Sequence, residues 1–334
     1  MTKRERVKHA LSHKETDFTP YNIELTSEAM RRFAAHTGVA AADFAEFAGN
    51  HIEKLSCNGG SWIKDGYFKD EWGVVWNRTV DKDIGVVEKY ELPNANFDGY
   101  TFPEPDLKTI EARVKALSED GRGRFKLAKV GVTLFERAWS LRGMENLMYD
   151  MYDDEAFVSE LTARITDHNL KIVECALGYD VDGFYFGDDY GSQAGLMFSD
   201  ALWRKYIKPN LSRLFKPIKA RGLAIAFHSC GDISKILPDM VEIGLDCYQT
   251  VQPEIYDLEK LKAGYAGRLA FWGAVSTQQF LPTARPGEIA PLVKKTIGIL
   301  GKGGGYICGP THQVPHDVPP ENITALISFL KNQN

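Results

Sequence analysis

The sequence predicts an α/β protein, a (β/α)8 TIM barrel with an antiparallel β-hairpin or meander inserted in its N-terminal half. Short β-compatible runs alternate with helical periodicity along most of the chain, as in parallel sheets joined by helices. The length of 334 residues suits one barrel. Polar and reactive residues also gather where the predicted strands end, which is the active-site edge of such barrels. We therefore expect residues 1–334 to form a single domain.

The strands and helices follow in order along the chain. Seven strands are expected to begin at Thr19, Lys126, Gly183, Leu223, Cys247, Leu269 and Tyr306. An eighth is expected near residues 138–142 or inside the insertion. Helical periodicity predicts helices over 2–13, 143–152, 156–179, 200–221, 233–243, 257–265, 288–300 and 322–331. Thr26 or Ser27 is placed to cap the helix after the first strand, and Pro209 and Pro217 should kink or break the helix over 200–221.

Residues 47–95 form the predicted insertion, which we expect to cover the mouth of the barrel. Two runs, D-E-W-G-V-V-W-N-R-T-V and G-V-V-E-K-Y-E-L, are typical of a hairpin or small meander. The segment is rich in aromatic residues. We interpret most of these rings as a mini-core that holds the insertion together, and one or two could still wall a substrate pocket.

Composition and charge narrow the class of protein. The formal net charge is −5 and no basic tail is present, so nucleic-acid binding is not expected. No apolar run reaches the roughly 18 residues of a membrane span, and the N-terminus lacks a signal-peptide core. The five cysteines are scattered, which favours reduced thiols and a cytoplasmic protein.

The stretch L-A-I-A-F-H-S-C-G at 223–231 is the main candidate for chemistry. Alternation along an extended chain puts His228 and Cys230 on the same face. An imidazole and a thiolate are ligands that Zn²⁺ accepts, so the pair predicts part of a zinc site. The alternative is a hydrogen-bonded core histidine beside a small buried cysteine.

Other strand ends offer further candidates, each with an alternative role. Asp188 and Asp189 are neighbours, so only one can face inward; it would be a general acid or a substrate anchor, or else a helix cap. His312 would be a third metal ligand or a loop histidine. Cys308 competes with His312, but it lies inside a strand, where a buried thiol is expected. Glu24 would bind metal or cap its own helix.

Four stretches of the chain resemble the uroporphyrinogen decarboxylase superfamily. They are F-H-S-C-G-D-I, E-I-G-L-D-C-Y-Q-T-V-Q-P-E, R-L-A-F-W-G-A-V-S-T-Q and G-G-G-Y-I-C-G-P-T-H-Q-V-P-H-D-V-P-P-E-N-I. The resemblance spans nearly the whole length and implies a (β/α)8 barrel. Tetrapyrrole decarboxylases have an arginine-rich motif, P-x-W-x-M-R-Q-A-G-R-Y, where this chain has T-P-Y-N-I-E-L-T-S-E-A-M. Because a substrate with several carboxylates needs cationic partners, we do not expect that activity.

The other branch of the superfamily contains corrinoid-dependent methyltransferases. The resemblance implies zinc bound by H-x-C, which His228 and Cys230 match, and by a later ligand after the last strand. Thiol-methylating members place a cysteine there, and alignment brings it nearest His312. A ligand set of Glu24, His228, Cys230 and His312 would be harder than one with two cysteines and would favour an oxygen substrate.

The resulting hypothesis is a zinc-dependent methyltransferase that moves a methyl group from a methoxylated, aromatic substrate to the Co(I) corrinoid of a partner protein. The sequence has no corrinoid-binding D-x-H-x-x-G motif, so the corrinoid belongs to a separate carrier. Asp188 or Asp189 would hold a substrate hydroxyl. The other expected substrate contacts are Tyr21, Trp72, Trp76, Tyr190 and Gln252. The alternatives are a metal-free decarboxylase of a small acid and a non-catalytic binder of a corrinoid or tetrapyrrole. The sequence leaves open the identity of the methyl donor, the final methyl acceptor and whether the protein forms a homodimer.

Overall fold

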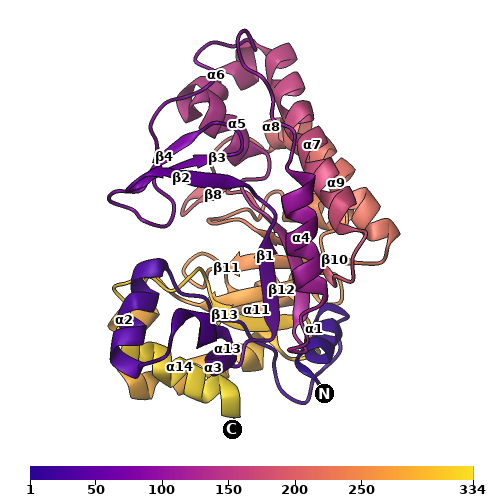
Figure 1. Ribbon diagram of the computed structural model, residues 1–334. Helices are drawn as coiled ribbons and strands as arrows, with labels where there is room; N and C mark the ends of the chain where they lie inside the picture. Colours follow the sequence, from indigo (N-terminus) through magenta and orange to yellow (C-terminus); the bar gives the residue numbers. More distant parts are fainter. Residues whose placement is uncertain (334) are drawn as a thin grey trace. The chain divides into compact units, whose positions relative to one another are not determined.

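The computed structural model describes residues 1–333 (Figure 1). The chain divides into two compact units. The first comprises Met1–Glu53, Gly121–Phe125 and Asp246–Asn334, and the second comprises Lys54–Asp120 and Lys126–Leu245. The expectation of one domain over 1–334, with 47–95 covering its mouth, stays a prediction.

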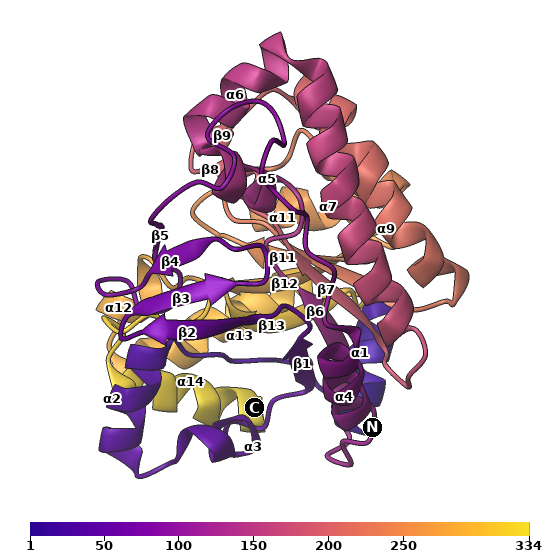
Figure 2. The same cartoon turned by 45° about the horizontal axis from the view of Figure 1, so that its top comes forward.

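Parallel strands form the framework of the second unit. Its neighbouring strands are, in order, β1 (Ile52–Ser56), β6 (Phe125–Val130), β7 (Gly183–Gly187) and β10 (Ala224–His228), and the first two begin in the first unit. Phe186 and Phe227 pack their rings against Phe215 of α9 (Lys208–Ala220), at 5.5 and 6.3 Å. One face of the sheet is thus covered by helices, among them α7 (Glu155–Ala176) and α9, which lie side by side (Figure 2). The other helices of the second unit are α4 (Leu107–Ser118), α5 (Phe135–Arg142), α6 (Met144–Asp153), α8 (Asp200–Leu202) and α10 (Leu237–Glu242). Two short strands of this unit, β8 (Gly191–Ser192) and β9 (Gly195–Leu196), pair with each other.

The first unit has parallel strands of its own, β11 (Cys247–Val251), β12 (Ala270–Val275) and β13 (Tyr306–Pro310), in that order. Tyr21 bridges Cys308, and the Tyr21 carbonyl accepts the backbone N–H of His51 at 3.0 Å. The extended segment around Tyr21, expected as the first strand, therefore lies between β13 and the start of β1 and pairs through isolated bridges. The helices here are α1 (Lys3–Leu11), α2 (Ser27–Thr37), η1 (Ala41–Asp43), α3 (Phe44–Ala48), α11 (Leu258–Tyr265), α12 (Phe280–Thr283), α13 (Pro286–Leu300) and α14 (Pro320–Asn332).

The predicted fold class, a TIM-barrel-like α/β fold with a β-meander, is confirmed. The eighth strand is β1, inside the predicted insertion, whereas residues 138–142 belong to α5. The helix expected over 200–221 is present as a continuous helical segment from Asp200 to Ala220, in which a π-helical stretch, η2 (Trp203–Ile207), joins α8 to α9 just before Pro209. Pro217 lies inside α9. Thr26 caps α2, since its side chain accepts the N–H of Ala29.

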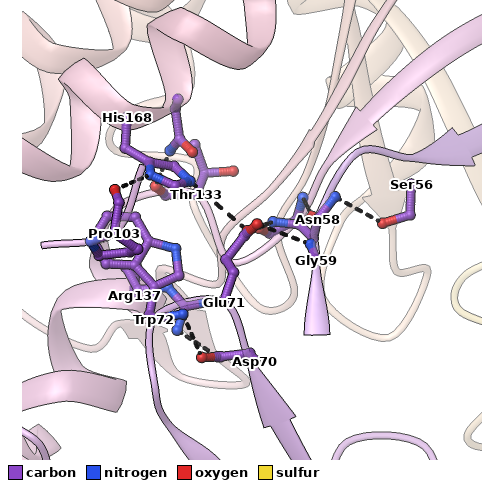
Figure 3. Close-up of polar contacts among 12 residues, drawn as sticks. Ser56, Asn58, Gly59, Asp70, Glu71, Trp72, Pro103, Thr133, Arg137 and His168 are labelled. Atoms are coloured by element: carbon purple, nitrogen blue, oxygen red, sulfur yellow. Dashed lines mark hydrogen bonds and ion pairs between the residues drawn. The ribbon is translucent and has the colours of Figure 1, made fainter. Parts of the chain in front are cut away.

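The meander forms a separate antiparallel sheet of β2 (Gly60–Lys64), β3 (Tyr67–Asp70), β4 (Val75–Asn77) and β5 (Val86–Val87). Trp72 and Trp76 are buried in it. The carboxylate of Asp70 accepts a hydrogen bond from the Trp76 indole at 2.9 Å. It also accepts one from Arg137 of α5 at 2.6 Å (Figure 3). The mini-core interpretation therefore describes the surroundings of both tryptophans, and their contact with substrate stays a prediction.

A second contact ties the meander to α7. The His168 ring lies 4.5 Å from the Trp72 ring, and its Nδ1 is 2.9 Å from the Pro103 carbonyl oxygen. Glu71 lies on the other side of His168 and accepts the backbone N–H of Gly59 at 3.0 Å (Figure 3). The meander is thus fixed to both α5 and α7 through buried polar groups.

Removal of the Arg137 charge should destabilise the protein. In Arg137→Met, the carboxylate of Asp70 stays buried without its cation, and we expect the free energy of unfolding to fall by about 3 kcal/mol. Arg31→Met is the matched control, because the Arg31 side chain is 75% exposed in its pair with Glu28 and should change stability by less than about 1 kcal/mol. Denaturant unfolding of both variants measures the difference, and equal stabilities would show that the buried pair does not hold the meander in place.

Candidate metal centre

His228 and Cys230 converge at the end of β10, as the alternation of the sequence predicts. Phe227 lies on the helix-covered face, so His228 lies on the opposite one, where it pairs in register with Gly187. The Cys230 Sγ is 3.5 Å from the His228 Nε2. Among the described residues Cys230 forms no disulfide, and the His228 side chain is 14% exposed. The two side chains can therefore offer a nitrogen and a sulfur to one ion.

The turn that follows Cys230 depends on two glycines. Gly231 has a φ of +78°, and a Cβ added to it would lie 2.2 Å from the carbonyl carbon of Gly191. The next residue, Asp232, donates its N–H to the Ser192 carbonyl at 2.8 Å. Only glycine allows this close approach of two backbones, which fixes the position of Cys230.

Asp189 is the one of the two neighbouring aspartates that faces the pair. Its Oδ1 accepts the N–H of Cys230 at 2.8 Å and lies 3.5 Å from the His228 Nε2. Asp188 is fully buried and accepts the backbone N–H groups at the start of α5, those of Leu134, Phe135 and Glu136. Asp188 thus has the capping role that the sequence offered as its alternative, and its catalytic role stays a prediction.

Glu136 adds a third carboxyl group to this cluster. Burial and the charges of Asp189 and Asp188 raise the pKa of Glu136 well above its usual value. Burial also raises the pKa of Asp188 to about 7, against the effect of the backbone N–H groups that it accepts. Burial in this cluster therefore disfavours the charged forms of both carboxyl groups.

Glu24 and His312, the other two predicted ligands, belong to the first unit. The carbonyl of Glu24 accepts the N–H of Val314 at 2.8 Å, so the segments that contain these two residues pair side by side. Because Thr26 caps α2, Glu24 does not have the capping role that was its alternative. His312 follows β13 and is half-buried.

Cys308, the competitor of His312, lies inside β13. Its side chain is fully buried, and burial raises the pKa of the Cys308 thiol to about 12. Because metal binding needs the thiolate, this environment disfavours Cys308 as a ligand.

The remaining predicted substrate contacts are buried. The Tyr21 hydroxyl donates to the Ala48 carbonyl at 3.0 Å. The Tyr190 ring stacks on Phe227 with the ring centres 5.8 Å apart, on the helix-covered side of the sheet. Gln252 is 4% exposed, and its carbonyl accepts the N–H groups of the turn after β11. These positions show packing roles, and substrate contact at them stays a prediction.

Three residues on the same side of the sheet as His228 were not predicted from the sequence: Lys54, Lys129 and Tyr185. The Lys54 Nζ lies 4.1 Å from the centre of the Tyr185 ring, and that ring lies 6.4 Å from the His228 ring. Lys129 pairs in register with Tyr185. The sequence feature that could have identified the two lysines is their position inside strand-like runs, I-E-K-L-S and F-K-L-A-K-V.

Known proteins with similar sequences and structures agree with this fold. A curated relative, the methylated-thiol–coenzyme M methyltransferase of Methanosarcina mazei, is 20% identical over 255 residues, 73% of this chain and 66% of the relative, just under two thirds of its length. A solved structure described as a methyltransferase from Methanosarcina mazei has a TM-score of 0.77 at 16% identity, covering 100% of this chain and 99% of its own. A B12-independent methionine synthase from Shewanella sp. W3-18-1 has a TM-score of 0.50 at 11% identity, covering 97% of both chains. At such identities, the structural matches establish the fold alone.

Among the described residues, no helix combines the length and apolar character that crossing a bilayer requires.

The family of the chain follows from its sequence. The model of the family described as "Uroporphyrinogen decarboxylase (URO-D)" matches residues 86–333, well over half of the chain. The protein therefore belongs to the uroporphyrinogen decarboxylase family, as the four stretches of its sequence predicted.

Proposed function

We propose that the protein is a zinc-dependent methyltransferase that moves a methyl group from a methoxylated aromatic substrate to the Co(I) corrinoid of a partner protein. The observation that supports this most strongly is the 3.5 Å separation of the Cys230 Sγ and the His228 Nε2, on the face of the sheet opposite the helices. Nitrogen and sulfur are donors that zinc prefers. Two similar proteins are described as methyltransferases, which favours methyl transfer over decarboxylation.

The proposed zinc ligands are Glu24, His228, Cys230 and His312. His228 and Cys230 bring a nitrogen and a sulfur within 3.5 Å of each other, and His312 is included as the nitrogen donor that follows β13. Glu24 is included because its segment pairs with the one that contains His312. A bound zinc ion would act as a Lewis acid and stabilise the negative charge that develops on the leaving oxygen. A zinc ion held by one sulfur and three harder donors would favour an ether oxygen as the substrate atom. A zinc ion held by two sulfurs would favour a thiol substrate.

Asp189 is the proposed positioning residue, and it is also proposed to hold a substrate hydroxyl. By accepting the N–H of Cys230 beside His228, its carboxylate orients both ligands. In the transfer, the electron pair of Co(I) forms the new bond to the methyl carbon. The C–O bond breaks and its electron pair stays on the oxygen, which takes up a proton. Within the carboxyl cluster of Glu136, Asp188 and Asp189, Asp189 is the member that faces the pair.

Anaerobic incubation of the zinc-loaded protein with a Co(I) carrier protein and a panel of methoxyarenes tests this function. We expect the absorbance of methyl-Co(III) to appear with at least one methoxyarene and to be weaker with the corresponding methylthioarene. A zinc-loaded protein that methylates no carrier across the panel would contradict the proposal. Decarboxylation of a small acid by metal-free protein would instead support the alternative activity.

A further inference from the structure

We infer that the substrate is an organic anion, and that Lys54 and Lys129 bind its carboxylate beside the metal pair. This inference rests on the proposed function, because it names the substrate class of the same site. All the residues that support it belong to the second unit, on the sheet face opposite the helices. We call this face the inner face.

Strand register places Lys129 on the inner face, and the contact of Lys54 with the Tyr185 ring places Lys54 there as well. Lys129 and Ala226 are the register partners of Tyr185, on β6 and β10. Lys126, three residues before Lys129, donates to the carbonyl of Ser118 in α4 and so lies on the helix-covered face. Because side chains alternate, Lys129 lies on the opposite face.

Tyr185 connects the lysines to the metal pair. Its side chain is 5% exposed, and the Lys54 Nζ lies over its ring at 4.1 Å. Its ring centre is 6.4 Å from that of His228. Along the strands, the row of Tyr185 precedes the row of His228 by two residues, about 7 Å. Lys129 therefore belongs to the row before that of His228, and the Lys54 ammonium lies beside the tyrosine of that row.

Glycines flank His228 within its own row of the sheet. Gly187 is the register partner of His228, and a Cβ added to it would lie 3.9 Å from the His228 Cβ and from the Gly131 Cα. A Cβ added to Gly131 would lie 3.7 Å from the Lys129 Cε. Neither glycine therefore places a side chain next to His228, and the Lys129 side chain extends toward this row.

The charges favour a carboxylate at the lysine end of an aromatic substrate. Ammonium groups donate charge-assisted hydrogen bonds to carboxylates, which are stronger than neutral ones. The Tyr185 ring holds the Lys54 ammonium in place by a cation–π contact. A methoxybenzoate could thus direct its methoxy group to His228 and Cys230 while its carboxylate meets Lys54 and Lys129.

Binding of 4-methoxybenzoate and its neutral counterpart 4-methoxybenzamide to zinc-loaded protein, measured by calorimetry, tests this inference. We expect the parent protein to bind the benzoate at least about tenfold more tightly than the amide. Lys54→Met and Lys129→Met should each weaken benzoate binding roughly tenfold and change amide binding less than about twofold. Lys54→Arg and Lys129→Arg, which keep the charge, should restore most of the affinity, and Lys69→Met, at an exposed meander position, should have no effect.

Two results would overturn the inference: equal affinity of the parent protein for both probes, or equal losses for both probes in the Lys→Met variants. Its failure is distinguishable from failure of the proposed function. Methyl transfer from both probes with the same kcat/KM would contradict the anion site and leave the methyltransferase intact. Charge-dependent binding without methyl transfer from any methoxyarene would contradict the methyltransferase and support the anion site.

Discussion

His228→Ala and Cys230→Ala should each abolish stoichiometric zinc binding and lower the rate of methyl transfer by roughly 1,000-fold or more. Each variant removes one of two ligand atoms that lie 3.5 Å apart. A Lewis acid supplies several kcal/mol of charge stabilisation to a transition state, and about 4 kcal/mol corresponds to that loss of rate. Metal analysis after gel filtration and the rate of methyl-Co(III) formation measure the two effects.

Two control variants separate the site from general effects of mutation. His316→Ala removes an exposed loop histidine, and Cys175→Ala removes another free thiol; both should keep full zinc content. The site variants should melt within a few degrees of the parent protein in the absence of zinc, because neither side chain is fully buried. Undiminished zinc in either site variant would show that the metal binds elsewhere.

Gly231→Ala should damage the metal centre without removing a ligand. Its φ is +78°, and the new Cβ would meet the Gly191 carbonyl carbon at 2.2 Å and the Ser192 nitrogen at 2.5 Å. The two backbones must separate, which we expect to lower the free energy of unfolding by about 4 kcal/mol. Because Cys230 is the preceding residue, its sulfur should move, and zinc affinity should fall roughly 100-fold.

Gly222→Ala is the matched control for this effect. Gly222 also has a positive φ, +68°, but a Cβ there would meet no heavy atom within 4 Å. It should lose only about 1 kcal/mol and keep its zinc affinity. Denaturant unfolding and competitive zinc titration of both variants give the comparison. If Gly231→Ala behaved like Gly222→Ala, the close approach of the two backbones would have no part in positioning Cys230.

Strand periodicity explains why much of the site could be predicted from the sequence. Alternation alone places His228 and Cys230 on one face, and the structure brings their ligand atoms together. The same rule shows that only one of Asp188 and Asp189 can face inward. It does not show which one, because the choice depends on α5, whose first N–H groups bind Asp188.

Other features depend on contacts between segments that are distant in the sequence. The strand β1 is short and polar, I-E-K-L-S, so its pattern did not distinguish it from the insertion. Trp72 and Trp76 are aromatic residues in a loop-rich segment, a composition that suits a pocket as well as a core. Only the position of Arg137, far along the chain, shows that Asp70 and these rings form a buried cluster.

Membership of the uroporphyrinogen decarboxylase family leaves the chemistry to the residues of this chain. The N-terminal segment around Tyr21 has no arginine cluster for a substrate with several carboxylates. A nitrogen and a sulfur meet at the end of β10 instead, with Lys54 and Lys129 one row away. This arrangement suits a small, singly charged substrate beside a metal ion.

X-ray absorption at the zinc edge of the zinc-loaded protein would test the central claim most directly. We predict one equivalent of zinc with a single sulfur neighbour at about 2.3 Å and nitrogen or oxygen neighbours at about 2.0–2.2 Å, and loss of the sulfur signal in Cys230→Ala. Two sulfur neighbours would place a second cysteine in the site and favour a thiol substrate. A zinc ion with no sulfur neighbour would contradict the metal centre proposed at His228 and Cys230.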